Sequence, residues 1–350
     1  MQFLMRQWKR SIAGVLCLVA TAAWAQVPYK IVTASARGTY IQIGRDLAKF
    51  VAPDAGIDLE AVPSAGSAEN VQRLRHEPGV KFALVQSDVY QAFLDQAAGG
   101  NAEAREMIVP LRLIMPLYNE EIYFIARADS NLNYVHEIKD AKINVGPLLS
   151  GTAMSATTLY RQMFGAPVAD ANASFLTNEE ALVKLTGDKS IDVVVVVAGQ
   201  PAKLLVDMKP EARQLIKLLK FDPNQPASQA AMKTYFPATV RASSYPNLLT
   251  EDIAGIAVKA YLVTYDYNLG MTVHRLTKFA RSLCANFDKL QTQGHPKWRE
   301  VEFALPELSR GWSYYPPMFR EMKSCMANKA KPPKPVKPCT QQERILGLCK

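Results

Sequence analysis

The sequence IDVVVVVAGQP, residues 191–201, is a nearly continuous run of β-branched residues that ends in a short polar turn. A run of this kind without polar alternation is typical of a strand buried on both faces of a parallel sheet. The turn Ala198-Gly199-Gln200-Pro201 closes the run, and a helical pattern follows it. This segment therefore predicts one unit of strand, turn and helix in an α/β fold.

Four earlier segments repeat this order of strand, polar turn and helix. The predicted strands are Ile31–Thr33, Leu59–Val62, Val80–Val85 and Lys142–Val145, and the turns after them are residues 35–40, 64–70, 86–88 and 150–152. The repetition predicts a doubly wound α/β architecture. In such sheets ligands bind at the carboxyl ends of the strands. Each helix start there leaves backbone N–H groups unpaired, which favours an anionic group.

Two crossings divide the predicted α/β units between two lobes. The segment Leu117–Arg127 separates the two series of units and is predicted to be a hinge strand. A second crossing is predicted near Thr234–Arg241, where prolines and small residues interrupt the pattern. Lobe 1 then comprises residues 26–117 and about 240–325, and lobe 2 comprises residues 118–239. Two lobes joined by two crossings form a cleft that can close.

The N-terminal 25 residues predict export. Lys9 and Arg10 precede the uncharged run Ser11–Ala23, and Ala23-Trp24-Ala25 forms an A-x-A cleavage site. We therefore expect a signal peptide over residues 1–25 and a mature protein in the periplasm. The uncharged run is too short to span a bilayer as a permanent membrane anchor.

The formal charge of +9 is concentrated at the two ends of the chain. Residues 1–25 contribute +3 and residues 326–350 contribute +5, which leaves +1 for residues 26–325. A nearly neutral body lacks the concentrated basic face that binding to a polyanion requires, so no nucleic-acid partner is expected. The basic, proline-rich tail 326–350 is interpreted either as a solvated spacer or as an arm that contacts an acidic partner.

Four cysteines remain after cleavage of the predicted signal peptide: Cys284, Cys325, Cys339 and Cys349. An even number in an oxidising compartment predicts disulfides, and four cysteines allow three connectivities. We favour Cys284 with Cys325, which would join two helical segments, and Cys339 with Cys349, which would close a short terminal loop. The cysteine spacing fits no zinc site.

The sequence contains no evident catalytic motif. His76, His136, His274 and His295 lie in polar or loop-like contexts without the spacing of metal ligands. No Gly-x-Ser-x-Gly elbow or Ser-x-x-Lys motif stands at a strand end. We therefore expect a binding protein without cofactor or metal rather than an enzyme.

Five motifs occur in order within residues 29–264. They are residues 31–40 with Gly44, Gly66-Ser67-Ala68-Glu69-Asn70, Val85-Gln86-Ser87-Asp88, Val145-Gly146-Pro147 with Ser150-Gly151-Thr152, and Val197-Ala198-Gly199-Gln200-Pro201. Together they resemble the TAXI family, the solute receptors of tripartite ATP-independent periplasmic (TRAP) transporters. The resemblance implies a type II periplasmic-binding-protein fold that captures a small organic anion, such as 2-oxoglutarate or glutamate, for a TRAP-type permease. The alternatives are a periplasmic ligand sensor, an accessory protein and, less favoured, a periplasmic enzyme on this fold.

The polar turns and this resemblance together give the expected ligand-binding residues. They are Ser35, Arg37, Gly38, Thr39, Tyr40, Ser67, Asn70, Gln86, Ser87, Tyr118, Ser150, Gly151, Thr152, Gly199 and Gln200. Backbone N–H groups of the first lobe, including that of Gly38, would hold one carboxylate, and those of residues 150–152 would hold a second group. Arg37 stands where the family usually has glycine, and it would either clamp a carboxylate or fill that space. Asp88 is interpreted either as a helix cap or as a ligand contact. We expect a monomer.

Overall fold

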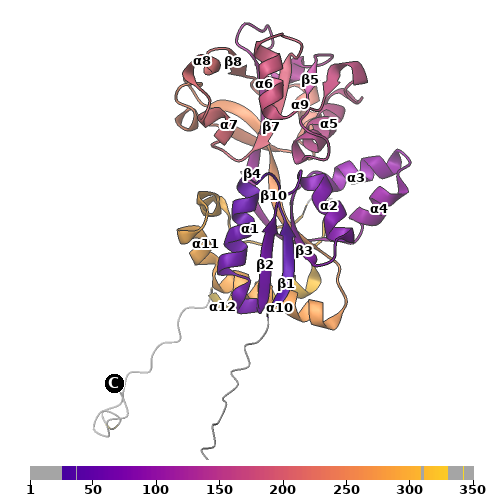
Figure 1. Cartoon of the computed structure of the whole chain (residues 1–350), viewed down its shortest axis with the longest axis vertical. Coiled ribbons are helices and arrows are strands. Elements are labelled where there is room, and N and C mark those ends of the chain that lie inside the picture. Colours follow the sequence, from indigo (N-terminus) through magenta and orange to yellow (C-terminus); the bar gives the residue numbers. More distant parts are fainter. Residues whose placement is uncertain (1–25, 37, 309–310, 330–341, 343–350) are drawn as a thin grey trace, which may run out of the picture.

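The computed structural model describes residues 26–36, 38–308, 311–329 and 342. The predicted signal peptide, Arg37, Cys339 and Cys349 lie outside these residues. The chain forms two α/β lobes, one above the other in Figure 1, whose strands belong to one mixed sheet in the order β2-β1-β3-β10-β4-β7-β5-β6. The predicted architecture of two α/β lobes is confirmed. Among the described residues, no helix combines the length and the apolar character that crossing a membrane needs.

The lower lobe in Figure 1 contains three parallel strands and the helices that connect or follow them. Its N-terminal elements are β1 (Val27–Val32), α1 (Thr39–Phe50), η1 (Pro53–Ala55), β2 (Ile57–Val62), α2 (Ser67–His76), β3 (Val80–Gln86), α3 (Val89–Ala98) and α4 (Ala102–Ile108). Its C-terminal elements are α10 (Gly270–Ala285), α11 (Phe287–Gln293), η5 (Pro296–Glu300) and α12 (Pro316–Lys329).

The upper lobe is built in the same way around β7, β5 and β6, which also pair in parallel. Its elements are η2 (Val135–Glu137), β5 (Ile143–Asn144), α5 (Gly151–Phe164), η3 (Asp170–Asn172), β6 (Ala173–Ser174), α6 (Asn178–Thr186), β7 (Val193–Ala198), α7 (Lys203–Val206), α8 (Pro210–Arg213), β8 (Ile216–Leu218), α9 (Pro226–Ala231), β9 (Phe236–Val240) and η4 (Ala242–Ser244). Strand β8 pairs with β4, and β9 pairs with β10.

Strand β7 is buried on both faces, as its run of valines predicts. Val193 and Val195 belong to one hydrophobic cluster with residues of α5, and Val194 and Val196 belong to another with residues of α6. All four side chains are at most 3% exposed. Because successive side chains of a strand point to opposite faces, helices must cover both sides of the sheet here. The lower lobe repeats this arrangement, with Ile31 packing on α1 and α10 and Val32 packing on α2 and α3.

Two long antiparallel strands, β4 (Leu111–Arg127) and β10 (Ile253–Tyr265), connect the lobes. The lower half of β10 pairs with β3, and its upper end, Ile253–Ala257, pairs with β9. Residues 236–240 therefore run alongside the upper lobe, and the chain returns to the lower lobe within β10 rather than near Thr234–Arg241. The division into lobes that we propose keeps β4 as the first crossing and moves the second crossing to β10.

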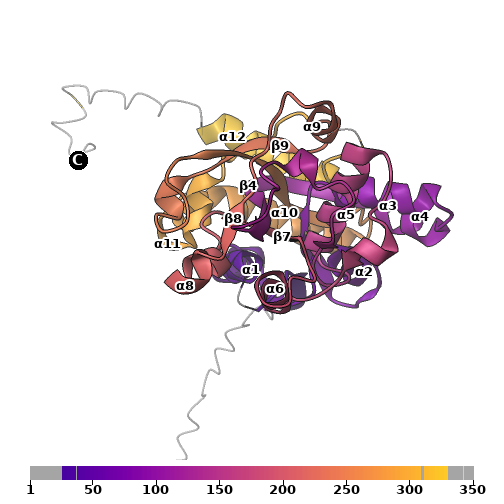
Figure 2. The ribbon, with the colours of Figure 1, turned by 90° about the horizontal axis from the view of Figure 1, so that it is seen from above.

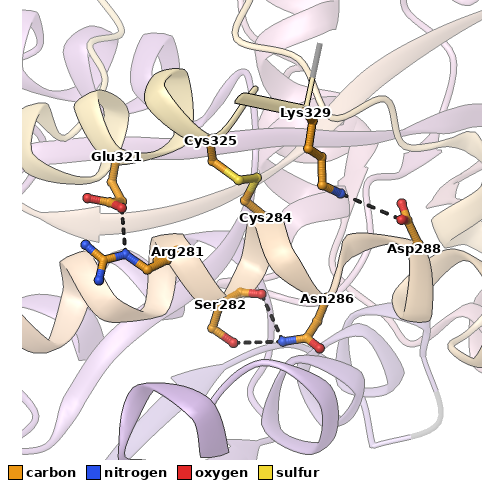
Figure 3. Close-up of a disulfide and its surroundings, with 8 residues drawn as sticks. All are labelled: Arg281, Ser282, Cys284, Asn286, Asp288, Glu321, Cys325 and Lys329. Atoms are coloured by element: carbon orange, nitrogen blue, oxygen red, sulfur yellow. Dashed lines mark hydrogen bonds and ion pairs between the residues drawn. A yellow bond between two sulfur atoms is a disulfide. The ribbon is translucent and has the colours of Figure 1, made fainter. Parts of the chain in front are cut away.

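The predicted disulfide between Cys284 and Cys325 is present in the lower lobe, where it joins α10 to α12 (Figure 3). The Cα atoms of the two residues are 6.5 Å apart. Ion pairs flank the bridge, with Arg281 donating to Glu321 over 2.7 Å. Trp312 and Tyr315 are also buried, in two different hydrophobic clusters that both include residues of the lower lobe.

Candidate functional site

Four consecutive polar residues, Tyr118-Asn119-Glu120-Glu121, lie in the middle of β4, where the lobes meet. The side chains of Tyr118, Glu120 and Glu121 are only 1%, 5% and 6% exposed. Burying a carboxylate costs free energy unless hydrogen bonds or an opposite charge compensate it. Among the described residues, no group of His, Cys, Asp or Glu is arranged to hold a metal ion. The hinge strand therefore places two buried carboxylates, without a metal cluster, at the lobe boundary.

The Glu120 carboxylate is held by two residues of the lower lobe. The hydroxyl of Tyr40, from the first turn of α1, donates to Glu120 Oε2 over 2.8 Å. The side-chain amide of Gln86, at the end of β3, donates from Nε2 to the same oxygen over 3.4 Å. Burial raises the pKa of Glu120 to about 7, although these two hydrogen bonds oppose the shift. The carboxylate thus lies in an environment that disfavours its charge.

The other end of the Gln86 amide links the two lobes. Gln86 Oε1 accepts hydrogen bonds of 3.3 Å from the hydroxyls of Ser67, at the start of α2, and Ser155, on α5 of the upper lobe. The backbone N–H of Gln86 donates to Ser67 Oγ over 3.0 Å. A chain of polar contacts therefore runs from Glu120 through one amide group to both lobes.

Two glycines let the starts of α2 and α5 face each other across the boundary. Gly66 has a φ of +137°, and a Cβ atom there would lie 2.7 Å from the backbone nitrogen of Gly151. A Cβ atom on Gly151 would in turn overlap the Gln86 amide. Figure 2 shows α5 in the upper lobe above the helices of the lower lobe, and α5 contacts both α2 and α3. The positive ends of two helix dipoles consequently meet at this point.

A second polar contact between the lobes joins Asp88 and Tyr235. Asp88 precedes α3 but makes no capping hydrogen bond, and its side chain is completely buried. The Tyr235 hydroxyl, from the upper lobe, donates to Asp88 Oδ2 over 2.8 Å and also lies 3.0 Å from the carbonyl oxygen of Ser155. Burial raises the pKa of Asp88 to about 6, although the neighbouring Ser155 hydroxyl and the hydrogen bond from Tyr235 oppose this shift.

The raised pKa of Asp88 predicts a pH-dependent effect of an Asp88→Asn substitution. In the unfolded chain Asp88 should titrate near its ordinary value of 3.8, so it is protonated in both states below about pH 4 and adds no pH dependence there. Between about pH 4 and 6 the unfolded chain is ionised at Asp88 while the folded protein keeps the proton, so stability falls as pH rises across this window and levels off above pH 6. The free energy of unfolding of Asp88→Asn relative to wild type should therefore increase by up to about 3 kcal/mol between pH 4 and 7.

Urea denaturation of both proteins at a series of pH values measures this difference directly. If the difference in the free energy of unfolding between Asp88→Asn and wild type does not change between pH 4 and 7, Asp88 does not have a raised pKa in the folded protein.

A third contact region involves Lys297 on η5, whose side chain is almost fully buried. Its ammonium group lies 2.6 Å from Glu300 Oε2 and 5.6 Å from the ring centroid of Tyr118. A Cβ atom on Gly199 of the upper lobe would lie 2.7 Å from Lys297 Cε. Beside it, the backbone N–H of Gln200 donates to Glu121 Oε2 over 2.8 Å. Both hinge carboxylates thus have partners at the boundary, and Glu121 bonds to the upper lobe.

The sequence profile of the NMT1-like family matches residues 31–307, which includes both lobes and all of these contacts. This chain belongs to the NMT1-like family. The matched region covers both α/β lobes and the paired hinge strands, and the finer assignment to the TAXI family stays a prediction.

Several solved structures resemble this NMT1-like chain at low identity. The periplasmic binding protein BugD is 14% identical, with a TM-score of 0.46, and the match covers 87% of this chain and 95% of BugD. A TctC solute binding protein from Polaromonas is 18% identical, with a TM-score of 0.43, and the match covers 87% and 99% of the two chains. XAC2383 from Xanthomonas citri, solved with ATP, is 10% identical, with a TM-score of 0.46, and the match covers 87% and 98%.

Seven of the predicted ligand-binding residues of this NMT1-like chain come together at the lobe boundary. They are Tyr40, Ser67, Gln86, Tyr118, Gly151, Gly199 and Gln200. Whether these residues contact a ligand stays a prediction. Ser35, Gly38 and Thr39 lie at the start of α1, where the N–H of Gly38 donates to the carbonyl of Ser35 over 2.9 Å. That N–H group is therefore bonded within its own turn.

The remaining predicted residues stabilise the surrounding turns. Asn70 donates from Nδ2 to the carbonyls of Thr33 and Leu84, which fixes the ends of β1 and β3. Ser150 caps α5 by accepting the N–H of Ala153 over 3.0 Å. Ser87 accepts the N–H of Lys259 on its hydroxyl and the Trp312 indole N–H on its carbonyl, and Thr152 accepts the N–H of Val197 over 3.4 Å.

Sequence reasoning missed five residues that complete the boundary: Glu120, Glu121, Ser155, Tyr235 and Lys297. A polar run inside the apolar hinge strand was a usable signal for the first two. Lys297 and Tyr235 stand far along the chain from the polar turns, and nothing in their local sequence marks them as boundary residues.

Proposed function

We propose that the chain is a periplasmic solute-binding receptor that captures a small organic anion between its lobes and performs no catalysis. Membership of the NMT1-like family supports a binding role. The two-lobed architecture supports a ligand that contacts both lobes, because such a ligand favours the closed state through contacts that the open state lacks. The expected class, a dicarboxylate or an acidic amino acid, follows from the resemblance of the polar turns to the TAXI family.

The observation that carries this proposal is the meeting of two helix starts from different lobes. Gly66 and Gly151 bring the first turns of α2 and α5 to within contact distance. Unpaired N–H groups and the helix dipole make such starts favourable for a carboxylate. The hydroxyls of Ser67 and Ser155, again one from each lobe, already converge on a single acceptor oxygen. A ligand carboxylate placed here would hold the lobes together.

The proposed partner and location rest on the sequence. The five motifs that resemble the TAXI family support delivery of the ligand to a TRAP-type membrane permease. The predicted cleaved signal peptide over residues 1–25 supports a periplasmic location. Removal of residues 326–350 would test the tail, because lost delivery with unchanged affinity would assign it to docking on the permease.

A thermal-shift screen of the mature protein against small organic acids and amino acids tests the receptor function. A true ligand present at about 100 times its dissociation constant should stabilise the protein by about 2.7 kcal/mol. The function is wrong if no compound in the screen raises the melting temperature.

A further inference from the structure

The side-chain amide of Gln86 occupies the junction between the hinge carboxylate and the facing helix starts. Its NH2 group points to Glu120 Oε2, and its oxygen receives the hydroxyls of Ser67 and Ser155 beside Gly151. All three hydrogen bonds are long, at 3.3–3.4 Å. The Glu120 carboxylate could therefore accept a stronger hydrogen bond than the one from the amide. The Ser67 and Ser155 hydroxyls could likewise donate to a stronger acceptor, such as a carboxylate.

The buried hydroxyl of Tyr118 is a second possible hydrogen-bond acceptor beside Glu120. Tyr118 lies two residues before Glu120 on β4, and the Glu120 charge acts on its hydroxyl. Burial, followed by the Glu120 charge, raises the pKa of the Tyr118 hydroxyl well above its ordinary value. That hydroxyl is buried and has no hydrogen-bond partner among the described residues. Such a group is costly to leave unpaired, and a ligand is one means of pairing it.

Among the described residues, Lys297 is a cation whose charge acts on Glu120, and its ammonium group is already paired. Lys297 pairs with Glu300, and of the effects on Glu120 its charge is the weakest, behind burial, the two hydrogen bonds and the repulsion from Glu121. Among the residues that the structure describes here, the two hinge carboxylates, Glu120 and Glu121, thus face the paired ammonium group of Lys297. A ligand that brought only negative charge would add to this imbalance, whereas a ligand with a positive group would reduce it.

We propose that the captured solute carries an ammonium group beside its carboxylate, and that Glu120 and the Tyr118 hydroxyl receive this ammonium group. The ligand displaces the Gln86 side-chain amide, and its carboxylate takes the position of the amide oxygen, at the Ser67 and Ser155 hydroxyls and the start of α5. The ligand is therefore an α-amino acid rather than the corresponding 2-oxo acid. This inference rests on the proposed receptor function and narrows it, since it makes Glu120 the residue that sets ligand specificity.

Matched pairs of ligands test this inference in the intact mature protein at pH 8. Calorimetric titrations compare L-glutamate with 2-oxoglutarate, L-aspartate with oxaloacetate, L-alanine with pyruvate, and L-leucine with 4-methyl-2-oxopentanoate. Within each pair only the ammonium group is replaced by a ketone. In the pair that binds best, we expect the amino acid to bind about 100-fold or more tightly than the oxo acid, as the loss of a buried charge pair implies.

The Glu120→Gln variant tests the residue itself. It should weaken the amino acid by about 30-fold or more and the oxo acid by less than about threefold, because only the amino acid loses a charge partner. Glu121→Gln, one residue along the strand and on the opposite face, should cause a smaller loss. Removing a buried carboxylate should not impair folding, which the melting temperature of each variant without ligand will show.

The outcomes of these titrations separate the inference about the ammonium group from the proposed receptor function. Equal or tighter binding of the oxo acid by wild type overturns the inference and leaves the receptor function standing, whether or not Glu120→Gln folds. Equal losses for both ligands in Glu120→Gln, or an equal loss in Glu121→Gln, also overturn it. Failure of every member of every pair to bind, together with a negative thermal-shift screen, would instead overturn the proposed function.

Discussion

A Gly151→Val variant is expected to fold normally and to show no measurable solute binding. Gly151 is the first residue of α5, and even a Cβ atom there would overlap the Gln86 amide of the lower lobe. The added methyl groups of valine would keep the lobes apart by more than a hydrogen bond can span. Most of each lobe's hydrophobic packing is retained, but Met154 of α5 also packs with the lower lobe, so the free energy of unfolding should fall by no more than about 2 kcal/mol.

Calorimetric titration with a ligand found in the thermal-shift screen measures this effect. The matched control is Gly270→Val, because Gly270 is also the first residue of its helix, α10, and a Cβ atom there would meet no other part of the described protein within 4 Å. That variant should bind as wild type does. Wild-type affinity in Gly151→Val would show that closure of this boundary is not needed for binding.

Removal of the disulfide between Cys284 and Cys325 is expected to lower the free energy of unfolding by about 4 kcal/mol. The bridge spans 41 residues, and in the chain-entropy account the stabilisation grows with the length of the loop that is closed. It joins two helices of the lower lobe, α10 and α12 (Figure 3), and none of the contacts described above at the lobe boundary involves them. The double variant Cys284→Ser/Cys325→Ser should therefore lose stability but keep its ligand affinity.

Urea denaturation of this double variant, with and without a thiol reductant, measures the contribution of the bridge. The reductant should destabilise wild type by nearly as much as the double substitution does, and it should have a much smaller effect on the variant. Equal stability of wild type and variant under oxidising conditions would contradict a structural role for this bridge.

The architecture was predictable because the residue types within each strand indicate whether one or both of its faces are buried. The valines of β7 pack alternately into two hydrophobic clusters, which is the arrangement that an unbroken β-branched run indicates. The polar turns at the strand ends likewise reach the lobe boundary through Ser67, Gln86 and Gly151. Local pattern and tertiary structure agree at these positions, because a parallel strand buried on both faces leaves few alternatives.

The electrostatics of the boundary were not predictable in this way. Glu120 acquires its altered pKa from burial between lobes, and its partners Tyr40 and Gln86 are 80 and 34 residues away in sequence. Tyr235 reaches Asp88 over a separation of 147 residues. Such pairs depend on how the chain returns through β10, and the predicted position of that return differed from the one that the strand pairing gives.

Hydrogen–deuterium exchange with and without a bound solute tests most directly whether the solute binds between the lobes. We expect slower exchange on both sides of the boundary, at the start of α2 around Ser67, at the start of α5 around Gly151, and in the centre of β4 around Glu120. A Gly151→Val protein treated in the same way should show none of these changes. Protection confined to one lobe, or located away from these three segments, would contradict capture of the solute between the lobes.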